Sequence, residues 1–386
     1  MSRLDARRLL WVAPLALGLV LGTACARREP PKKEAKSKSV KVAHAAELAA
    51  PSASAVTAKE PAAALESAGL SASAAPPAEE PPDVEPTTIE EQRTALLQGM
   101  QRALKLDGEA LARVRTILSG SPVLGQGNPP VTVHPMTRAE CRKRRSEHPD
   151  LPAGDPRCAA PNMVALYDPV AGETPDQAKV CIDQYEFPNI ACEYPVVHVR
   201  ALEATQLCNA IGKRICDAHE WEGACAGALH APETEYAFGK PREQMRAVHN
   251  QLRTITWSYG PTKDHGKCAT NSSKSKGCEA SEYSKCGSNT YPTGAFPECR
   301  SPLGAFDLHG NAAEHMNLPR VPEELASRAG LGMTEMKGSW FIFSKYEAHI
   351  DDCRWRAPSW HESRIDDVRS HSNYHLGFRC CRDLRP

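Results

Sequence analysis

The stretch that decides the fold is Gly304-Ala-Phe-Asp-Leu-His-Gly-Asn-Ala-Ala-Glu314, a glycine-rich turn that contains two acidic residues. Other segments of similar character precede and follow it: Cys181-Ile-Asp-Gln-Tyr-Glu-Phe-Pro-Asn189, Gly212-Lys-Arg-Ile-Cys-Asp-Ala-His-Glu-Trp-Glu222, Lys337-Gly-Ser-Trp340, Cys353-Arg-Trp-Arg356 and Leu376-Gly-Phe-Arg-Cys380. One such segment says little about a protein, whereas several in this order and spacing are specific.

The composition places the main core in the second half of the chain. The 386 residues carry 47 basic and 47 acidic side chains, and this zero net charge argues against a protein that coats nucleic acid. After Trp11 the next aromatic residue is Tyr167, and the last is Phe378. Because aromatic side chains dominate core burial, the region before Tyr167 can form only a modest core.

The N-terminus has the layout of an export signal. Arg3, Arg7 and Arg8 precede an apolar run at 9–21, and small residues then lead to Cys25. This layout predicts a lipoprotein signal in which Cys25 is lipidated, so that a lipid anchor alone attaches the protein to the membrane. Plain secretion and an uncleaved signal anchor are the alternatives.

The cysteines favour an oxidising compartment. Apart from Cys25 there are 14, an even number, and no C-x-x-C pair typical of zinc or iron–sulfur sites occurs. We therefore expect structural disulfides in an exported protein of the cell envelope or outer membrane, or in a secreted one.

Composition and periodicity divide the chain into four parts. A signal peptide occupies 1–25, and a disordered Ala/Pro-rich tether occupies 26–86. A short helical segment and an extended lead-in cover 87–160, and the main domain covers 161–386. The helical segment begins with a capping box at Thr88 and forms either a hairpin packed on the main domain or a partner-docking element.

Within the main domain, regular structure is expected to be sparse. Strands are predicted at 180–185 and 195–199, and helices at 202–211 and 217–224. Residues 228–300 are predicted to be long irregular loops that disulfides hold together.

The quoted segments together resemble the formylglycine-generating enzyme family, also called sulfatase-modifying factors, over about 165–383. The resemblance implies an α+β domain, the family's variant of the C-type-lectin-like fold. It also implies that a disulfide joins Cys208 to Cys380, and that Cys225 pairs with Cys353 or Cys216.

The chemistry of the family depends on two cysteines that bind copper(I). They lie between the Gly-Ser motif and an Arg-Tyr-Arg stretch, matched here by Arg354-Trp355-Arg356, and Asp352 occupies the place of the second cysteine. Cys353 is one position away and is interpreted as a disulfide partner. Copper is therefore not expected, and formylglycine generation is expected to be lost.

The family's calcium site, in contrast, has matching residues. The resemblance assigns the ligands to Asp307, to the carbonyls of Gly310 and Ala312, and to Glu314, an oxygen set that suits calcium. The alternative is a tight turn with solvated carboxylates. Ala313 and His315 stand where the family usually has tryptophan.

His361, His371 and His375 could suggest another metal, but the sequence favours surface histidines, and it leaves any catalytic residue unknown. The leading hypothesis is a calcium-supported binding or scaffold module at the cell surface, with an unidentified protein or glycan ligand at the cell envelope. The alternative is a protein-modifying oxidoreductase with a different active site.

Overall fold

The computed structural model describes residues 84–279, 281–328 and 332–384. The expected signal peptide, Cys25 and nearly all of the expected tether therefore lie outside the described residues. The described part belongs to one compact unit that begins at Pro77.

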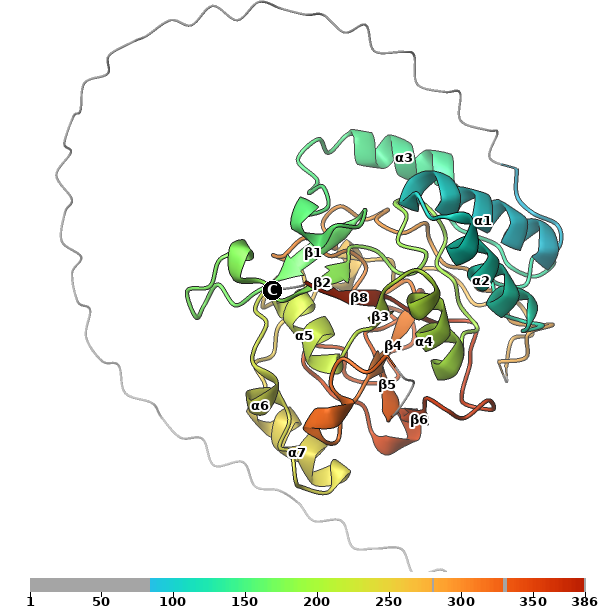
Figure 1. Ribbon diagram of the computed structural model, residues 1–386. Coiled ribbons are helices and arrows are strands. Elements are labelled where there is room, and N and C mark those ends of the chain that lie inside the picture. The colour runs from blue at the N-terminus through green and yellow to red at the C-terminus, as the bar shows by residue number, and fades with distance from the viewer. Residues whose placement is uncertain (1–83, 280, 329–331, 385–386) are drawn as a thin grey trace, which may run out of the picture. The chain divides into compact units, whose positions relative to one another are not determined.

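The described residues form a mixed α+β fold with short elements and long connections (Figure 1). The helices are α1 (Ile89–Leu104), α2 (Gly108–Ser119), α3 (Arg138–Ser146), α4 (Ala201–Ala210), α5 (Ala218–Ala226), α6 (Pro232–Glu235) and α7 (Arg242–Leu252). The strands are β1 (Met163–Leu166), β2 (Val180–Asp183), β3 (Arg214–Ile215), β4 (Ala313–Asn317), β5 (Met333–Lys337), β6 (Ser363–Arg364), β7 (Leu376–Phe378) and β8 (Cys380–Asp383). None of the described helices is long and apolar enough to cross a bilayer.

Two small sheets organise the main domain. The first has the order β1-β2-β8-β3 and is antiparallel, and the second has the order β6-β5-β4-β7, in which only β4 and β7 run parallel. Strands β7 and β8 belong to different sheets but are separated by the single residue Arg379. The chain therefore passes from one sheet to the other at this residue.

The α1–α2 hairpin packs against α4, as Figure 1 also indicates. Its capping box is formed by Thr88 and Glu91, as the sequence predicts. Leucine, methionine and valine side chains from both helices share one buried cluster with Leu207 and Phe378 of the main domain. Since burial of each such side chain contributes about 1.5–3 kcal/mol, the hairpin is an integral part of the core.

Seven disulfides connect the 14 cysteines of the described part. They are Cys141–Cys192, Cys158–Cys181, Cys208–Cys380, Cys216–Cys381, Cys225–Cys353, Cys268–Cys299 and Cys278–Cys286. The adjacent Cys380 and Cys381 thus attach β8 to α4 and to the residue after β3. Disulfides at this density are typical of exported proteins in an oxidising compartment.

The structure differs from the sequence prediction in several segments, including the short helix α6, which lies where only loops were predicted. The predicted strand at 195–199 is wrong, because His198 has φ 56°, and this left-handed conformation breaks an extended chain. Helix α7 lies where only loops were predicted; it buries just Met245 and His249, so its apolar stripe is short. Helix α3 was also missed, since Cys141 is its only buried residue.

Candidate functional site

The side chain of Arg379 lies fully buried between the two sheets. Its Nε and Nη2 donate to the two carboxylate oxygens of Glu314 on β4, at 2.7 and 2.6 Å. Its other donors reach the carbonyls of Asp183 and Gln184 at the end of β2, and that of Phe306. The two sheets are therefore joined by one guanidinium group that binds a carboxylate in bidentate geometry.

The residues of the expected calcium set lie in one turn and the strand that follows it. Asp307 and Gly310 are in the turn, Ala312 directly precedes β4, and Glu314 is within β4. Gly310 has φ 80°, and a Cβ at this position would lie 2.6 Å from the Ala269 carbonyl oxygen. Only glycine fits this sharp bend, which brings the two carboxylates into one buried region.

Asp307 has an oxygen that is free to bind a cation. Its Oδ2 accepts a hydrogen bond from the Gly294 amide, whereas its buried Oδ1 has no hydrogen-bond partner among the described residues. Burial raises the pKa of the Asp307 carboxyl to about 6, and the Gly294 hydrogen bond and Arg379 oppose this shift. An orphaned, buried carboxylate oxygen of this kind is unfavourable unless a proton or a cation satisfies it.

The sequence interpretation missed a third carboxylate, Glu186. Its two oxygens accept from the Ala312 amide and the Asn311 side chain, both at 2.7 Å. Burial, and then the charges of Asp307 and Glu314, raise the pKa of Glu186 well above its usual value. Glu186 lies inside the quoted Cys181–Asn189 segment, so its position in that motif was the available signal.

The donor set therefore fits a hard cation in part. Asp307 offers a free oxygen among three buried carboxylates, which together carry more negative charge than Arg379 neutralises. Glu314, in contrast, already uses both oxygens for Arg379 and also accepts from the Trp221 indole at 3.0 Å. A bound ion at this turn would have to share Glu314 with the arginine.

The segment that matches the family's Arg-Tyr-Arg stretch forms buried ion pairs. Arg356 contacts Glu222 at 3.0 Å, and Lys337 donates to the same carboxylate at 2.5 Å. Burial alone would raise the pKa of Glu222, but Arg356 and Lys337 hold it well below its usual value. Because the charges compensate one another, this network is a structural element of the core.

Asp352, at the place of the family's second cysteine, is also engaged. It lies 2.8 Å from Arg253, and the next residue, Cys353, forms its disulfide with Cys225. Every cysteine among the described residues is in a disulfide, so these residues offer no thiolate pair for copper(I).

A cavity of about 570 Å³ lies beside the segment that follows the Gly338-Ser339 motif. It is lined by Lys274, Ser281, Met336, Trp340, Ile342, Lys345, Tyr346, Ala348, Trp360, His361, His371, Asn373, Tyr374 and His375. Its inner wall belongs to a small separate core in which Trp340, Ile342 and Tyr374 pack with the Cys278–Cys286 disulfide. Part of the wall, from Trp340 to Ala348, comes from the segment between the two motifs where the family carries its cysteine pair.

The prediction of surface histidines is wrong for His375. Its ring is buried and stacks on Trp340, with 4.6 Å between the ring centroids. Burial lowers the pKa of His375 well below its usual value and that of His361 to about 3, so both rings are neutral near pH 7. His371 is exposed, as predicted. The burial of His375 follows from the parallel pairing of β7 with β4, which the sequence does not reveal.

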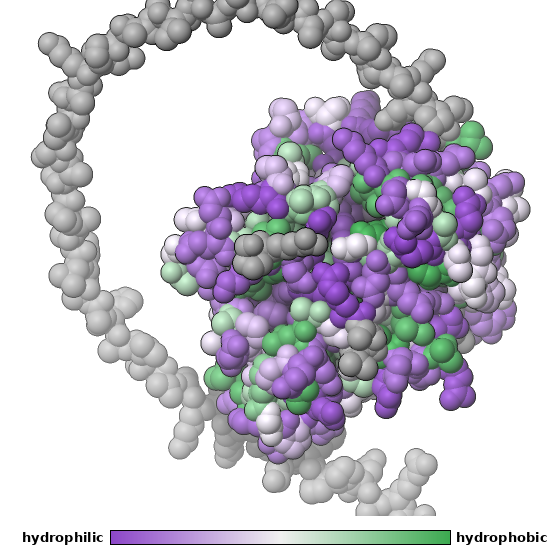
Figure 2. Space-filling model, viewed as in Figure 1, coloured by the Kyte–Doolittle hydropathy of each residue, from purple (hydrophilic) through white to green (hydrophobic). Residues whose placement is uncertain are grey.

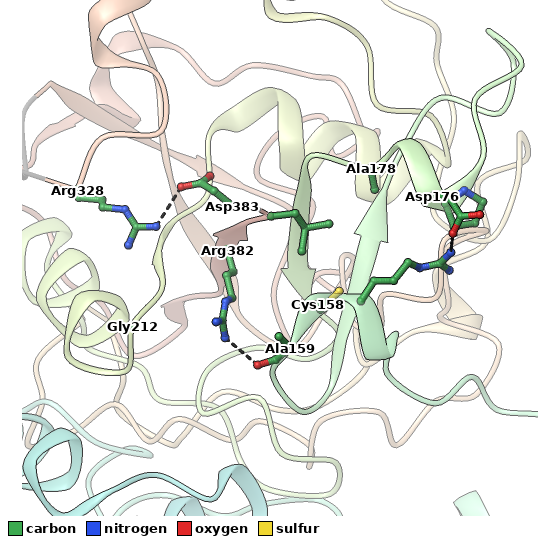
Figure 3. A pocket seen from close by; sticks show the side chains of 11 residues that line it. Cys158, Ala159, Asp176, Ala178, Gly212, Arg328, Arg382 and Asp383 are labelled. Carbon is green, nitrogen blue, oxygen red and sulfur yellow. Dashed lines mark hydrogen bonds and ion pairs between the residues drawn. The ribbon is translucent and has the colours of Figure 1, made fainter. Parts of the chain in front are cut away.

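A larger hollow of about 890 Å³ beside β8 is rich in arginine (Figure 3). Arg328 pairs with Asp383 at 3.0 Å, Arg382 donates to the Ala159 carbonyl, and Arg157 pairs with Asp176. Two of its three arginines are thus already in ion pairs, and the third donates to a backbone carbonyl. The face drawn in Figure 2 is mainly hydrophilic, with small separate apolar patches. The aromatic cavity is consequently the better candidate site.

The comparison with protein-family models agrees with this architecture. A family model described as "Sulfatase-modifying factor enzyme 1-like domain" matches residues 167–384. The chain belongs to this family, whose name-giving members are the formylglycine-generating enzymes. No curated protein matches it. A solved structure titled "Crystal Structure of CarF" is 12% identical over 53% of this chain and 87% of that chain, with a TM-score of 0.27.

The buried ion pair leads to a stability prediction. Arg379→Met leaves the Glu314 carboxylate buried without its counter-charge, and we expect the free energy of unfolding to fall by about 3–5 kcal/mol. Chemical denaturation measures this loss. The matched control is Arg369→Met at an exposed arginine, for which we expect a change within about 0.5 kcal/mol. Equal stability of the two variants would contradict the role assigned to Arg379.

Proposed function

We propose that this domain is a binding or scaffold module of the sulfatase-modifying factor family that does not generate formylglycine with copper. The observation that carries the proposal is the state of the cysteines: Cys353 is bonded to Cys225, and Asp352 is paired with Arg253. The chemistry of the family needs two free thiolates, and here the corresponding segment supports a cavity lined by aromatic side chains.

Calcium is proposed to support this module at the turn that contains Asp307. The free Oδ1 of Asp307 and the neighbouring carboxylates of Glu186 and Glu314 favour a hard cation there. Carbonyl groups of Gly310 and Ala312 are proposed to complete the set. The ion would stabilise the turn that positions β4, and no chemical step is assigned to it.

The cell surface is the proposed location. The disulfides indicate an oxidising, extracellular compartment. Lipidation of Cys25 is proposed to attach the protein to the outer face of the cell envelope. The ligand in this setting is proposed to be a protein or a glycan of the cell envelope.

Copper(I) titration tests the loss of the family's chemistry. In protein that carries Cys25→Ser and keeps its disulfides, we expect no stoichiometric copper(I)–thiolate complex and no reactive thiol after denaturation without reductant. Reduction should then expose the thiols of all 14 remaining cysteines, which serves as the control for the assay. A tight one-to-one copper(I) complex that Cys353→Ser abolishes would favour the alternative of an oxidoreductase.

Thermal unfolding tests the calcium proposal. An ion that binds only the folded state stabilises it by about 2.7 kcal/mol at a hundredfold excess over its dissociation constant. We therefore expect excess chelator to lower the unfolding temperature by several degrees, and Asp307→Asn to abolish this response.

Asp366→Asn is the control, because Asp366 is an exposed carboxylate far from the turn in sequence, paired with Arg364. It should respond to chelator as the parent does. Glu314→Gln is less informative, since it also breaks the ion pair with Arg379. Identical melting of the parent in calcium and in chelator would mean that the turn binds no ion.

Cell fractionation tests the anchor. If Cys25 carries the lipid, Cys25→Ser should move the protein from the membrane fraction to the soluble fraction while the disulfides remain intact. Membrane association that persists in the variant would instead indicate an uncleaved signal anchor.

A further inference from the structure

The aromatic cavity has an apolar interior of the size that small ligands occupy. Its volume of about 570 Å³ falls in the usual range of about 300–1,000 Å³ for ligand pockets. Trp340 and Tyr374 in its wall are 5% and 4% exposed, whereas Tyr346 and Trp360 are 65% and 68% exposed. Exposed aromatic side chains grouped beside a cavity mark a binding surface, and their faces can stack on a flat ligand.

The wall contains buried polar atoms that lack partners within the described ranges, and one of them is an obligate donor. The Trp340 indole N–H can only donate, and it is buried without a partner among the described residues. The side-chain oxygen of Asn373 is already used, because it accepts from the Tyr374 amide at 2.7 Å. The His375 Nδ1 and the His361 Nε2 are also buried without partners in the described part of the chain.

The charge of the wall is positive. It contains Lys274 and Lys345 but no aspartate or glutamate among its described residues. Lys345 donates to the carbonyls of Asn271 and Ser272, at 3.2 and 2.8 Å, and is held by them. Lys274 is exposed, and no hydrogen bond or ion pair is found for its ammonium group in the described structure.

From these features we infer that the cavity binds a small aromatic carboxylate. The flat ring stacks on the exposed Tyr346 and Trp360, and the buried Trp340 lies in the cavity wall. The carboxylate, which only accepts hydrogen bonds when ionised, satisfies donors of the wall and pairs with Lys274. This inference rests on the proposed binding function and gives that function a ligand class.

Calorimetric titration of the full chain with 2-naphthoate and with 2-naphthamide tests the inference, because the two probes share a ring system and differ in charge. We expect one equivalent of naphthoate to bind, with an affinity about tenfold or more above that of naphthamide. Tryptophan fluorescence should change in parallel, since two tryptophans line the cavity.

Matched variants locate the binding site. Lys274→Met should weaken naphthoate binding about tenfold and leave naphthamide binding unchanged. Lys276→Met, at an exposed lysine of the same loop outside the cavity wall, should change neither affinity. Trp360→Ala should weaken both probes, because it removes part of the stacking surface. All three positions are exposed, so we expect the variants to fold. Only variants that melt at the temperature of the parent are compared.

Three results would overturn the inference: equal affinities for the two probes, equal effects of Lys274→Met and Lys276→Met, or no binding by natively folded protein. Tight binding of glucuronate, an anion without an aromatic ring, would replace the aromatic ligand with an acidic sugar. The copper(I) titration tests separately whether the protein has lost the family's thiolate chemistry, whatever the naphthoate result. A protein that binds neither copper nor naphthoate would keep the proposed binding role and lose this ligand.

Discussion

The bidentate contact of Arg379 with Glu314 is the interaction on which the rest of the fold depends. Arg379 is the single residue between β7 and β8, which belong to different sheets, and Glu314 lies on β4 in the centre of the second sheet. Its remaining donors bind carbonyls of the first sheet and of the turn before β4. Helix α5 and a shared apolar cluster that includes Ile182 and Met316 also connect the two sheets, but Arg379 is the buried charged group that bridges them.

Other buried charges of the core are compensated in the same way. The buried pairs of Glu222 with Arg356 and Lys337 satisfy side chains from three of the sequence motifs. Once these charges compensate one another inside the core, their role is structural and independent of the copper-binding cysteines. Replacement of the second cysteine by Asp352, paired with Arg253, therefore leaves the framework intact.

The sequence predicted those parts of the structure that depend on local patterns or on the family's motifs. The capping box at Thr88, the helix that carries Cys208, and the α+β architecture all belong to this group. What it missed depends on contacts between distant segments. His375 is buried because β7 pairs with β4. Glu186 lies near Asp307 because the bend at Gly310 brings the turn that contains Asp307 close to Glu186. No local pattern encodes such contacts, and the single buried turn of α7 was too weak a periodic signal.

The position of β8 has a consequence for biogenesis. This strand is the last described element in chain order. It nevertheless carries the disulfide partners of Cys208 and Cys216, and it lies between β2 and β3 in the first sheet. Until residues 376–383 reach the oxidising compartment, Cys208 and Cys216 lack their partners and the first sheet lacks the strand between β2 and β3. The domain can therefore close only after this segment arrives.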